Sequence, residues 1–487
     1  MTPVARAEEP SDDDARAVAR RPIAAGRARS TTTDRWTLLL LAGAVAYLVA
    51  ALLRLAVDGH PLSVIDEHVH LDTQLEVHDG TFPYRGSRYG DGLIEEWACG
   101  AGHEAGALAK PCGDPTLGPA DLPSGQYTSG YIHYPTYFVG GEAFRWLVES
   151  VAGPQRPLDV YRAYAALLMA LGVMACGIVS WRLRLRGPAL LGGTLAPVSA
   201  AAILLYGTTV NPTSSAVLTG ALLGGAGLRW VLTGRGYRWL LAATALAACV
   251  AVTDSLPAGA FIIAIVVALV LRRSGRSLDS PWQPRWWHAA LLAGVVVVPV
   301  LAWGQVIAHR ATIPDSTLYA AYGFESWTPV VSDSLRELFT LHSPWNQASV
   351  LEAGTGRPLA ALVRAAGYGI PLWVTVLVFG TLVLGTLGVV RRAPAAAPSA
   401  RDPRGPASSL RVLAASTLAA VVLYPPALHV SNAVTGGFNT GIVDRYSISF
   451  APLLVWLALL LTRDRPAVAG VLAALSVVCV ISVGAVA

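Results

Sequence analysis

Acidic and histidine side chains crowd one short stretch of the chain, residues 66–72 (DEHVHLD), directly after the first apolar block and a short linker. Its acids are Asp66, Glu67 and Asp72, and its histidines are His68 and His70. A carboxylate beside the membrane could deprotonate an acceptor hydroxyl. The histidines could bind phosphate, and His70 could share a divalent cation with Asp66 or Asp72. The alternative is a solvated acidic loop, because acids recur from Asp58 to Asp121.

Two other segments place polar side chains beside apolar blocks. His133 and Tyr134 precede an amphipathic stretch that runs to Val151, a pattern typical of a helix lying in the membrane interface. Near the other end, Arg445 and Tyr446 open an apolar block. A guanidinium binds phosphate in a planar fork, although an arginine at a helix entrance also extends to the membrane surface without binding anything.

The chain has five cysteines, and they divide by surroundings. Cys176, Cys249 and Cys479 fall in apolar blocks and are expected to be small buried hydrophobic residues. Cys99 and Cys112 lie in a polar loop without the further Cys or His pair that a zinc site needs. If that loop is extracytoplasmic, its surroundings are oxidising, and a disulfide between these two is expected.

Composition identifies the class of protein. Of 487 residues, 54% are hydrophobic and 14% are charged, whereas soluble proteins have about 25% charged residues. The mean hydropathy is +0.50. These values exclude a soluble enzyme, a disordered chain and a small disulfide scaffold, and they indicate a polytopic protein of the lipid bilayer. The net charge of +5 comes from arginines near the membrane boundaries, so we expect no nucleic-acid partner.

A membrane-crossing helix needs about 20 mostly apolar residues. That rule predicts an all-α fold with about eleven spans, which leave two long outer loops and the interfacial helix. The predicted spans are Trp36–Val57, Leu158–Trp181, Pro188–Tyr206, Thr213–Thr233, Arg238–Thr253, Leu256–Leu271, His288–Ala308, Tyr368–Val390, Arg411–His429, Tyr446–Thr462 and Pro466–Val486. The fifth and sixth are short, so Asp254 between them marks a broken helix or a tight hairpin.

Arginine clusters decide the expected orientation, because basic residues stay on the cytoplasmic side. Most clusters, such as 182–186, 272–276 and 391–392, lie inside if the N-terminus is cytoplasmic. We therefore expect a multi-pass protein of the inner (plasma) membrane with an extracytoplasmic site. The predicted organisation is a disordered tail at 1–35, a transmembrane domain at 36–486, outer loops at 58–157 and 309–367, and a cytoplasmic linker at 391–410.

In the order of its motifs the chain resembles the C-type membrane glycosyltransferases (GT-C superfamily), in which an acidic residue or pair follows the first span. The matching strings are 65–70 (IDEHVH), 133–137 (HYPTY), 211–213 (NPT) and 444–446 (DRY), and they resemble a poorly characterised bacterial branch. Three features depart from that branch. The prolines around the acidic pair are missing, Thr136 replaces a proline, and Asp444 replaces the glycine before the arginine.

The resemblance implies a sugar donor linked to polyprenyl phosphate, and an acceptor hydroxyl on an envelope glycan, glycolipid or glycoprotein, with inversion. It implies that Asp66 is the general base, with Glu67 secondary, and that Arg445 binds the leaving phosphate. His68, His70, His133, Tyr134 and Tyr446 are the other candidate substrate ligands. Two alternatives remain open, a transporter or flippase of an envelope lipid and a non-catalytic envelope-assembly scaffold. A transporter predicts charges along several spans, where only Asp254 lies deep.

Overall fold

The computed structural model describes residues 28–57, 61–63, 66–101, 110–122, 125–276, 278, 281–314, 326–346, 358–388, 407–433 and 442–486. Within these ranges the chain is helical between its turns and loops, and the sole β-type pairing is an isolated bridge between Arg88 and Tyr127. The all-α class predicted from the apolar blocks is therefore confirmed.

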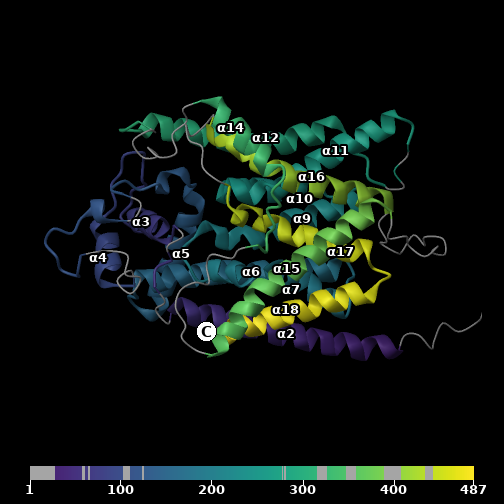
Figure 1. Ribbon diagram of the computed structural model, residues 1–487, viewed down its shortest axis with the longest axis horizontal. Helices are drawn as coiled ribbons and strands as arrows, with labels where there is room; N and C mark the ends of the chain where they lie inside the picture. Colours follow the sequence, from purple (N-terminus) through teal and green to yellow (C-terminus); the bar gives the residue numbers. More distant parts are fainter. Residues whose placement is uncertain are drawn as a thin grey trace, which may run out of the picture.

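Most helices lie side by side in one bundle, along the long axis of Figure 1. Its α-helices are α2 (Ala28–Val57), α6 (Pro157–Arg182), α7 (Pro188–Leu195), α8 (Ala201–Tyr206), α9 (Ala216–Thr233), α10 (Tyr237–Val250), α11 (Pro257–Arg273), α12 (Trp286–Arg310), α15 (Pro358–Thr386), α16 (Ala407–Ser431), α17 (Ala451–Leu461) and α18 (Pro466–Val486). Short 3₁₀ turns connect several of them, namely η4 (Ala196–Val198), η5 (Pro212–Ser215), η6 (Val252–Ser255) and η9 (Asp444–Phe450).

The bundle is that of a multi-pass membrane protein. Eight helices in the described residues are long and apolar enough to cross a bilayer. Three shorter apolar helices, Pro188–Val198, Tyr237–Val250 and Pro466–Ser482, occupy the places of the third, fifth and last predicted spans. Each predicted span thus coincides with an apolar helix, while a crossing by the three shorter ones stays a prediction.

The helices of the bundle are interrupted at two places for which the sequence supplies a reason. Pro197 lies in η4 between α7 and α8, and a proline has no N–H to continue the helix. Between α10 and α11 the backbone is extended at Ala251, and Pro257 begins α11. The intervening Asp254 is buried, and it accepts hydrogen bonds from Ser215 Oγ (2.8 Å) and Thr219 Oγ1 (2.9 Å). These contacts give Asp254 a structural role at the break.

The hydrophobic core of the bundle lies around α17, whose residues are all buried. Its neighbours α9, α15 and α16 pack against it. By contrast, α12 fully buries only His288 and Leu292 and exposes apolar side chains such as Val298 and Leu301. An apolar helix that is exposed in this way is suited to face lipid. The bundle therefore has a protein-buried centre and a lipid-facing edge.

A cap of short helices covers one end of the bundle (Figure 1). It consists of α3 (Glu67–His78), α4 (Asp91–Cys99), η2 (Pro119–Asp121), η3 (Gly130–Ile132) and α5 (Pro135–Ala152). The cap has its own apolar core, which contains Trp97 and includes Tyr161 from the start of α6. The expected disulfide between Cys99 and Cys112 is present in the cap.

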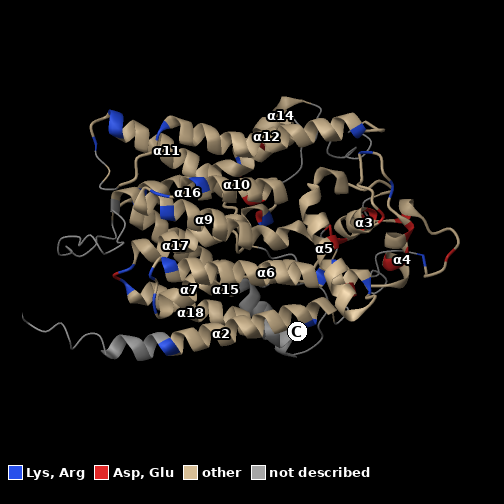
Figure 2. Cartoon of the chain, turned by 180° about the vertical axis from the view of Figure 1, so that it is seen from behind, with Lys and Arg blue, Asp and Glu red and all other residues tan. Residues whose placement is uncertain are grey.

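Charge is distributed unevenly between the two ends. Figure 2 shows Asp and Glu concentrated around α3 and α4, whereas basic residues lie at both ends and include the arginines that gather at the end of the bundle opposite the cap. The predicted interfacial helix is found as α5, which buries Tyr137 and Phe138 and exposes Trp146 (73%) and Val151 (83%). An exposed apolar face beside a membrane bundle fits an interfacial position, which stays a prediction.

Two predicted polar segments fall largely outside the described residues. α2 begins at Ala28, inside the predicted tail at 1–35, whose residues 1–27 are not described. The predicted linker at 391–410 is described only from Ala407, where α16 begins. The second predicted outer loop contains α14 (Trp327–Glu337), which packs on α16.

We predict that the cap is extracytoplasmic and that its disulfide forms in cells. A membrane-impermeant maleimide should label Cys99 and Cys112 on intact cells only after reduction. As a topological control, a cysteine placed by Ser274→Cys, at the exposed end of α11, should be labelled only after permeabilisation. Labelling of Ser274→Cys on intact cells, or of the cap cysteines without reductant, would contradict the prediction.

Candidate active site

Asp66 and Arg445 come from opposite ends of the sequence and form an ion pair. Arg445 Nη2 donates a hydrogen bond to Asp66 Oδ2 at 2.5 Å. The Asp66 side chain is 46% exposed, whereas that of Arg445 is 13% exposed. The carboxylate is therefore open to a substrate, while the cation that holds it is set into the protein.

The backbone at Asp66 favours that contact. Asp66 precedes α3 with φ 60° and ψ 2°, the left-handed region, and its side chain makes no capping hydrogen bond to α3. Aspartate tolerates this region better than most residues, and such conformations concentrate at functional sites. Arg445 belongs to η9, the 3₁₀ turn that leads into the buried helix α17. One partner thus lies on a strained turn and the other beside the core.

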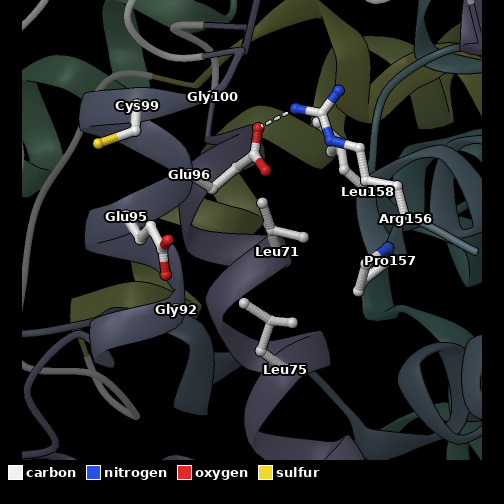
Figure 3. A pocket seen from close by; sticks show the side chains of 10 residues that line it. All are labelled: Leu71, Leu75, Gly92, Glu95, Glu96, Cys99, Gly100, Arg156, Pro157 and Leu158. Carbon is white, nitrogen blue, oxygen red and sulfur yellow. Dashed lines mark hydrogen bonds and ion pairs between the residues drawn. The ribbon is translucent and has the colours of Figure 1, made fainter. Parts of the chain in front are cut away.

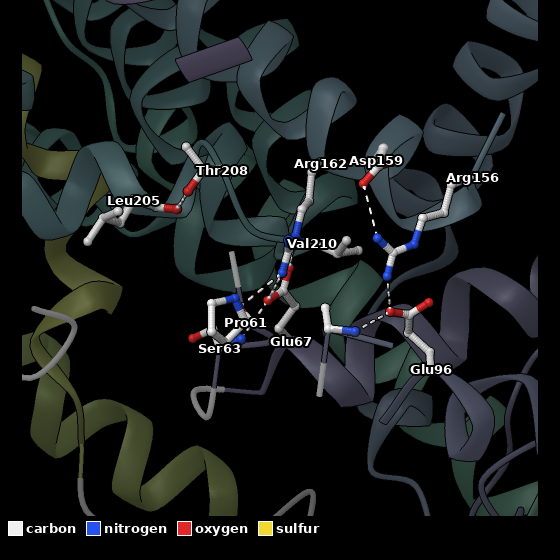
Figure 4. Close-up of polar contacts among 11 residues, drawn as sticks. Pro61, Ser63, Glu67, Glu96, Arg156, Asp159, Arg162, Leu205, Thr208 and Val210 are labelled. Atoms are coloured by element: carbon white, nitrogen blue, oxygen red, sulfur yellow. Dashed lines mark hydrogen bonds and ion pairs between the residues drawn. The ribbon is translucent and has the colours of Figure 1, made fainter. Parts of the chain in front are cut away.

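Glu67 lies next to Asp66 in the chain but has a different set of contacts (Figure 4). Its Oε1 accepts from Arg162 Nε (2.8 Å) and Val210 N (3.0 Å), and its Oε2 accepts from Arg162 Nη2 (3.0 Å) and Ser63 N (2.7 Å). Both charged side chains are 0% exposed. A carboxylate enclosed in this way has no access to an acceptor hydroxyl. We therefore assign Glu67 to structure, and not to the secondary catalytic role that the resemblance implied.

His70 and His133 lie beside the Asp66–Arg445 pair. His70 is one helical turn after Asp66, and its ring centroid is 4.6 Å from that of His133. Burial is the main cause that lowers the pKa of both, that of His70 well below its usual value and that of His133 to about 4. Both imidazoles are consequently neutral near pH 7. The positive charge beside Asp66 therefore comes from Arg445.

The remaining predicted ligands divide between the site and its surroundings. His68 packs its ring on Trp97 in the cap core, with centroids 5.0 Å apart. Tyr134 caps the start of α5 and lies against Trp303, and burial raises its pKa to about 12. Tyr446 lies under Arg445, whose Cζ is 5.5 Å from the ring centroid. The structure thus gathers Asp66, His70, His133, Arg445 and Tyr446, and turns His68 towards the cap.

The expected cation ligands do not form a ligand set. Asp72 Oδ1 accepts a hydrogen bond from Gly90 N at 2.9 Å, and burial raises the pKa of Asp72 to about 7. Asp66 is paired with Arg445, as described above. In the described part of the chain, no group of three or more His, Cys, Asp or Glu side chains could hold a metal ion. We therefore derive no step through a metal.

A separate cavity of about 400 Å³ lies in the cap, between α3, α4 and the start of α6 (Figure 3). Leu71, Leu75 and Leu158 contribute apolar wall, and an ion pair between Glu96 and Arg156 crosses its rim. Neither Asp66 nor Arg445 lines it. The cavity and the candidate active site are thus distinct places that share α3.

The partner of Glu67, Arg162, was not among the residues predicted from the sequence. Arg162 lies near the start of a predicted apolar span, and it is the cation that binds Glu67. A charge inside a span is costly unless it is paired, and that cost was the available signal. Asn211, from the 211–213 string of the resemblance, accepts a hydrogen bond from Thr213 N (2.9 Å) at the start of η5.

Comparison with known proteins yields little for this site. No protein-family model matches the chain, and no curated protein matches it. Among solved structures, one described as ArnT from Cupriavidus metallidurans bound to undecaprenyl phosphate is similar over 89% of this chain and 78% of that chain. The sequence identity is 16% and the TM-score is 0.34. A likeness of this strength carries no argument about the site.

We predict that the buried ion pair is essential for stability. Glu67→Gln leaves the Arg162 guanidinium buried without a counter-ion, which costs about 3–5 kcal/mol. Thermal unfolding in detergent should show a large fall in Tm. As a matched control, Glu149→Gln removes a partly exposed pair with Arg145 (2.8 Å) on α5 and should cost less than about 1 kcal/mol. Equal Tm values for the two variants would contradict the structural role of Glu67.

Proposed function

We propose that the chain is a GT-C-type membrane glycosyltransferase of the cell envelope. It transfers a sugar from a polyprenyl-phosphate donor to an acceptor hydroxyl of a glycan, glycolipid or glycoprotein, on the outer face of the inner membrane. The observation that carries the proposal is the open Asp66 carboxylate paired with Arg445 at the capped end of a multi-pass bundle. The order of the motifs, with acids after the first span and Arg-Tyr before α17, supports the same reaction class.

The chemistry follows from a base and a cation that lie side by side. Asp66 accepts the proton of the acceptor hydroxyl, and the acceptor oxygen attacks the anomeric carbon from the face opposite the lipid phosphate. The bond from that carbon to the phosphate oxygen breaks, and polyprenyl phosphate leaves with the bonding electrons. The sugar is transferred with inversion. A phosphate is a stable leaving group, so no separate protein acid is required.

Arg445 has a second function in this scheme besides binding the leaving phosphate. Without bound donor it pairs with Asp66, which is the proposed base. A guanidinium has five N–H donors in a planar fork that matches a phosphate. When the donor lipid arrives, its phosphate competes with Asp66 for these donors and loosens the pair. The carboxylate is then released to accept a proton when the donor is in place. The neutral rings of His70 and His133 add hydrogen bonds without further charge.

The charged groups buried in the described bundle do not favour a lipid transporter. Arg162 is paired with Glu67 at the capped end, and Asp254 is bonded to two hydroxyls of neighbouring helices. Neither belongs to a series of charges that continues through the described spans. A non-catalytic scaffold would keep the same fold, and it differs from the enzyme only in failing to consume donor.

Asp66→Asn should abolish general-base catalysis. The amide keeps the shape of the side chain and a hydrogen-bond acceptor for Arg445, but it cannot take up the acceptor proton, so turnover should fall about 10²–10⁴-fold. Purified protein incubated with a panel of polyprenyl-phosphate sugars and acceptors gives the rate of donor consumption. Asp79→Asn, at the exposed far end of α3, is the matched control and should retain wild-type turnover. Wild-type turnover in Asp66→Asn would refute the mechanism.

Arg445→Lys should also lose activity, although it keeps the positive charge. A lysine ammonium lacks the planar fork that binds two phosphate oxygens. We expect kcat/KM for the donor to fall about 10-fold or more, equivalent to about 1.4 kcal/mol. The same donor-consumption assay measures the effect. Full activity in Arg445→Ala at normal expression would show that Arg445 only anchors the helix.

A further inference from the structure

A second cluster of ionisable side chains includes Asp444, the residue before Arg445, and it centres on His342. His342 follows α14, and its side chain is 5% exposed. Its Nε2 is 2.5 Å from Glu337 Oε2, and its Nδ1 is 2.8 Å from Asp444 Oδ1. An ionised carboxylate only accepts hydrogen bonds, so both ring nitrogens must donate. With both acids ionised, the geometry therefore requires an imidazolium at His342.

The other groups around His342 complete the cluster without replacing that charge. Asn346 Nδ2 donates to Asp444 Oδ2 at 3.1 Å, so residues 342–346 contact both oxygens of Asp444. Glu337 Oε1 lies 3.5 Å from Arg336 Nη2 and 3.9 Å from His429 Nε2. The Tyr424 ring of α16 lies 6.0 Å from the imidazole. Each carboxylate thus has additional donors nearby, while the link between the two acids passes through His342.

Asp444 and Arg445 make the start of η9 a junction between the two outer loops. Asp444 binds the α14 segment through His342, and the next residue, Arg445, binds Asp66 from the first loop. The motif that this sequence resembles has glycine in place of Asp444, and a glycine has no side chain to make that bond. The acid at this position is therefore a feature of this chain that the resemblance does not account for.

We propose that His342 is a positioning residue that clasps Glu337 to Asp444 and thereby sets Arg445 against Asp66. We call Glu337, His342 and Asp444 the outer-loop clasp. Its effect on catalysis rests on the proposed function, whereas its effect on the structure does not. His342 itself touches none of the reacting groups, and it acts through the backbone that joins Asp444 to Arg445.

The clasp should weaken at alkaline pH. Burial alone lowers the pKa of His342, but the hydrogen bonds and charges of Asp444 and Glu337 outweigh burial and raise it above its usual 6.5. A histidine whose pKa is raised in the folded state stabilises that state fully below the unfolded pKa. The contribution is lost as the pH rises through the folded pKa. Neutral His342 has one N–H donor and can hold only one of the two acids.

Hydrogen–deuterium exchange of the full-length protein tests the clasp without any substrate. At pH 7, His342→Gln and Asp444→Ala should each speed exchange about 10-fold or more in peptides covering 327–346 and 442–450. His309→Gln, which removes an exposed histidine at the end of α12, is the matched control and should leave exchange unchanged. At pH 9, after correction for intrinsic rates, the wild type should approach His342→Gln. Wild-type protection in both clasp variants at pH 7 would overturn the proposal.

Donor kinetics test whether the clasp positions Arg445. We expect the wild-type KM for the polyprenyl-phosphate donor to rise at alkaline pH, where the clasp weakens. At pH 7, His342→Gln should raise this KM about 10-fold with a smaller change in kcat. The KM of this variant should then show no further rise at alkaline pH. If exchange in His342→Gln is faster but KM is unchanged, the positioning role is wrong, and His342 only anchors the α14 segment to Asp444. If the wild type consumes no donor, the proposed function fails, and the exchange result still decides whether the clasp exists. Should His342→Gln not fold, Asp444→Ala gives the same test.

Discussion

The buried ion pair between Glu67 and Arg162 determines how the cap meets the membrane bundle. It joins the start of α3 to α6, and Glu67 also binds the backbone at Val210, between α8 and η5. A buried charge that loses its partner is strongly destabilising, so these elements are fixed in one arrangement. Because Asp66 is the neighbouring residue, the same contact fixes the place from which its carboxylate reaches Arg445. Glu67, the structural acid, thus defines the position of Asp66, the proposed base.

Adjacent acids with separate functions follow from chain geometry. Side chains of consecutive residues point in different directions, so Asp66 and Glu67 could not both face one acceptor. One carboxylate is sealed between helices with four hydrogen-bond donors, and the other remains partly open beside a guanidinium. Burial thus makes Glu67 an anchor between helices, whereas the partly exposed Asp66 can still accept a proton or change its hydrogen-bond partner.

The candidate site has few charged side chains, because its two histidines are neutral and its positive charge lies on Arg445. Burial keeps His70 and His133 neutral, so in the proposed reaction Arg445 is the cation available to the donor phosphate. In the proposed clasp, the carboxylates of Glu337 and Asp444 flank the His342 imidazole, so a proton on His342 is balanced locally. Together these groups place the largely buried Arg445 cation next to the partly exposed Asp66 carboxylate. The proposed transfer uses this pairing, because a base takes the proton from the acceptor oxygen while a cation binds the phosphate that leaves the anomeric carbon.

The amino-acid sequence by itself determined the class of fold and the approximate places of the apolar helices. Runs of apolar residues are local signals, and a bilayer requires them wherever a helix crosses. Local signals also marked the Asp66 segment, the Cys99–Cys112 bridge and Arg445 as candidates. The sequence did not reveal that Glu67 binds Arg162, that His68 faces the cap, or that Asp72 is held by Gly90. These contacts join residues distant in the chain, except for Asp72 and Gly90, which a turn of the cap brings together. Only tertiary structure decided them, because burial and partner geometry, and not residue type, determine whether a carboxylate anchors a helix or remains available for chemistry.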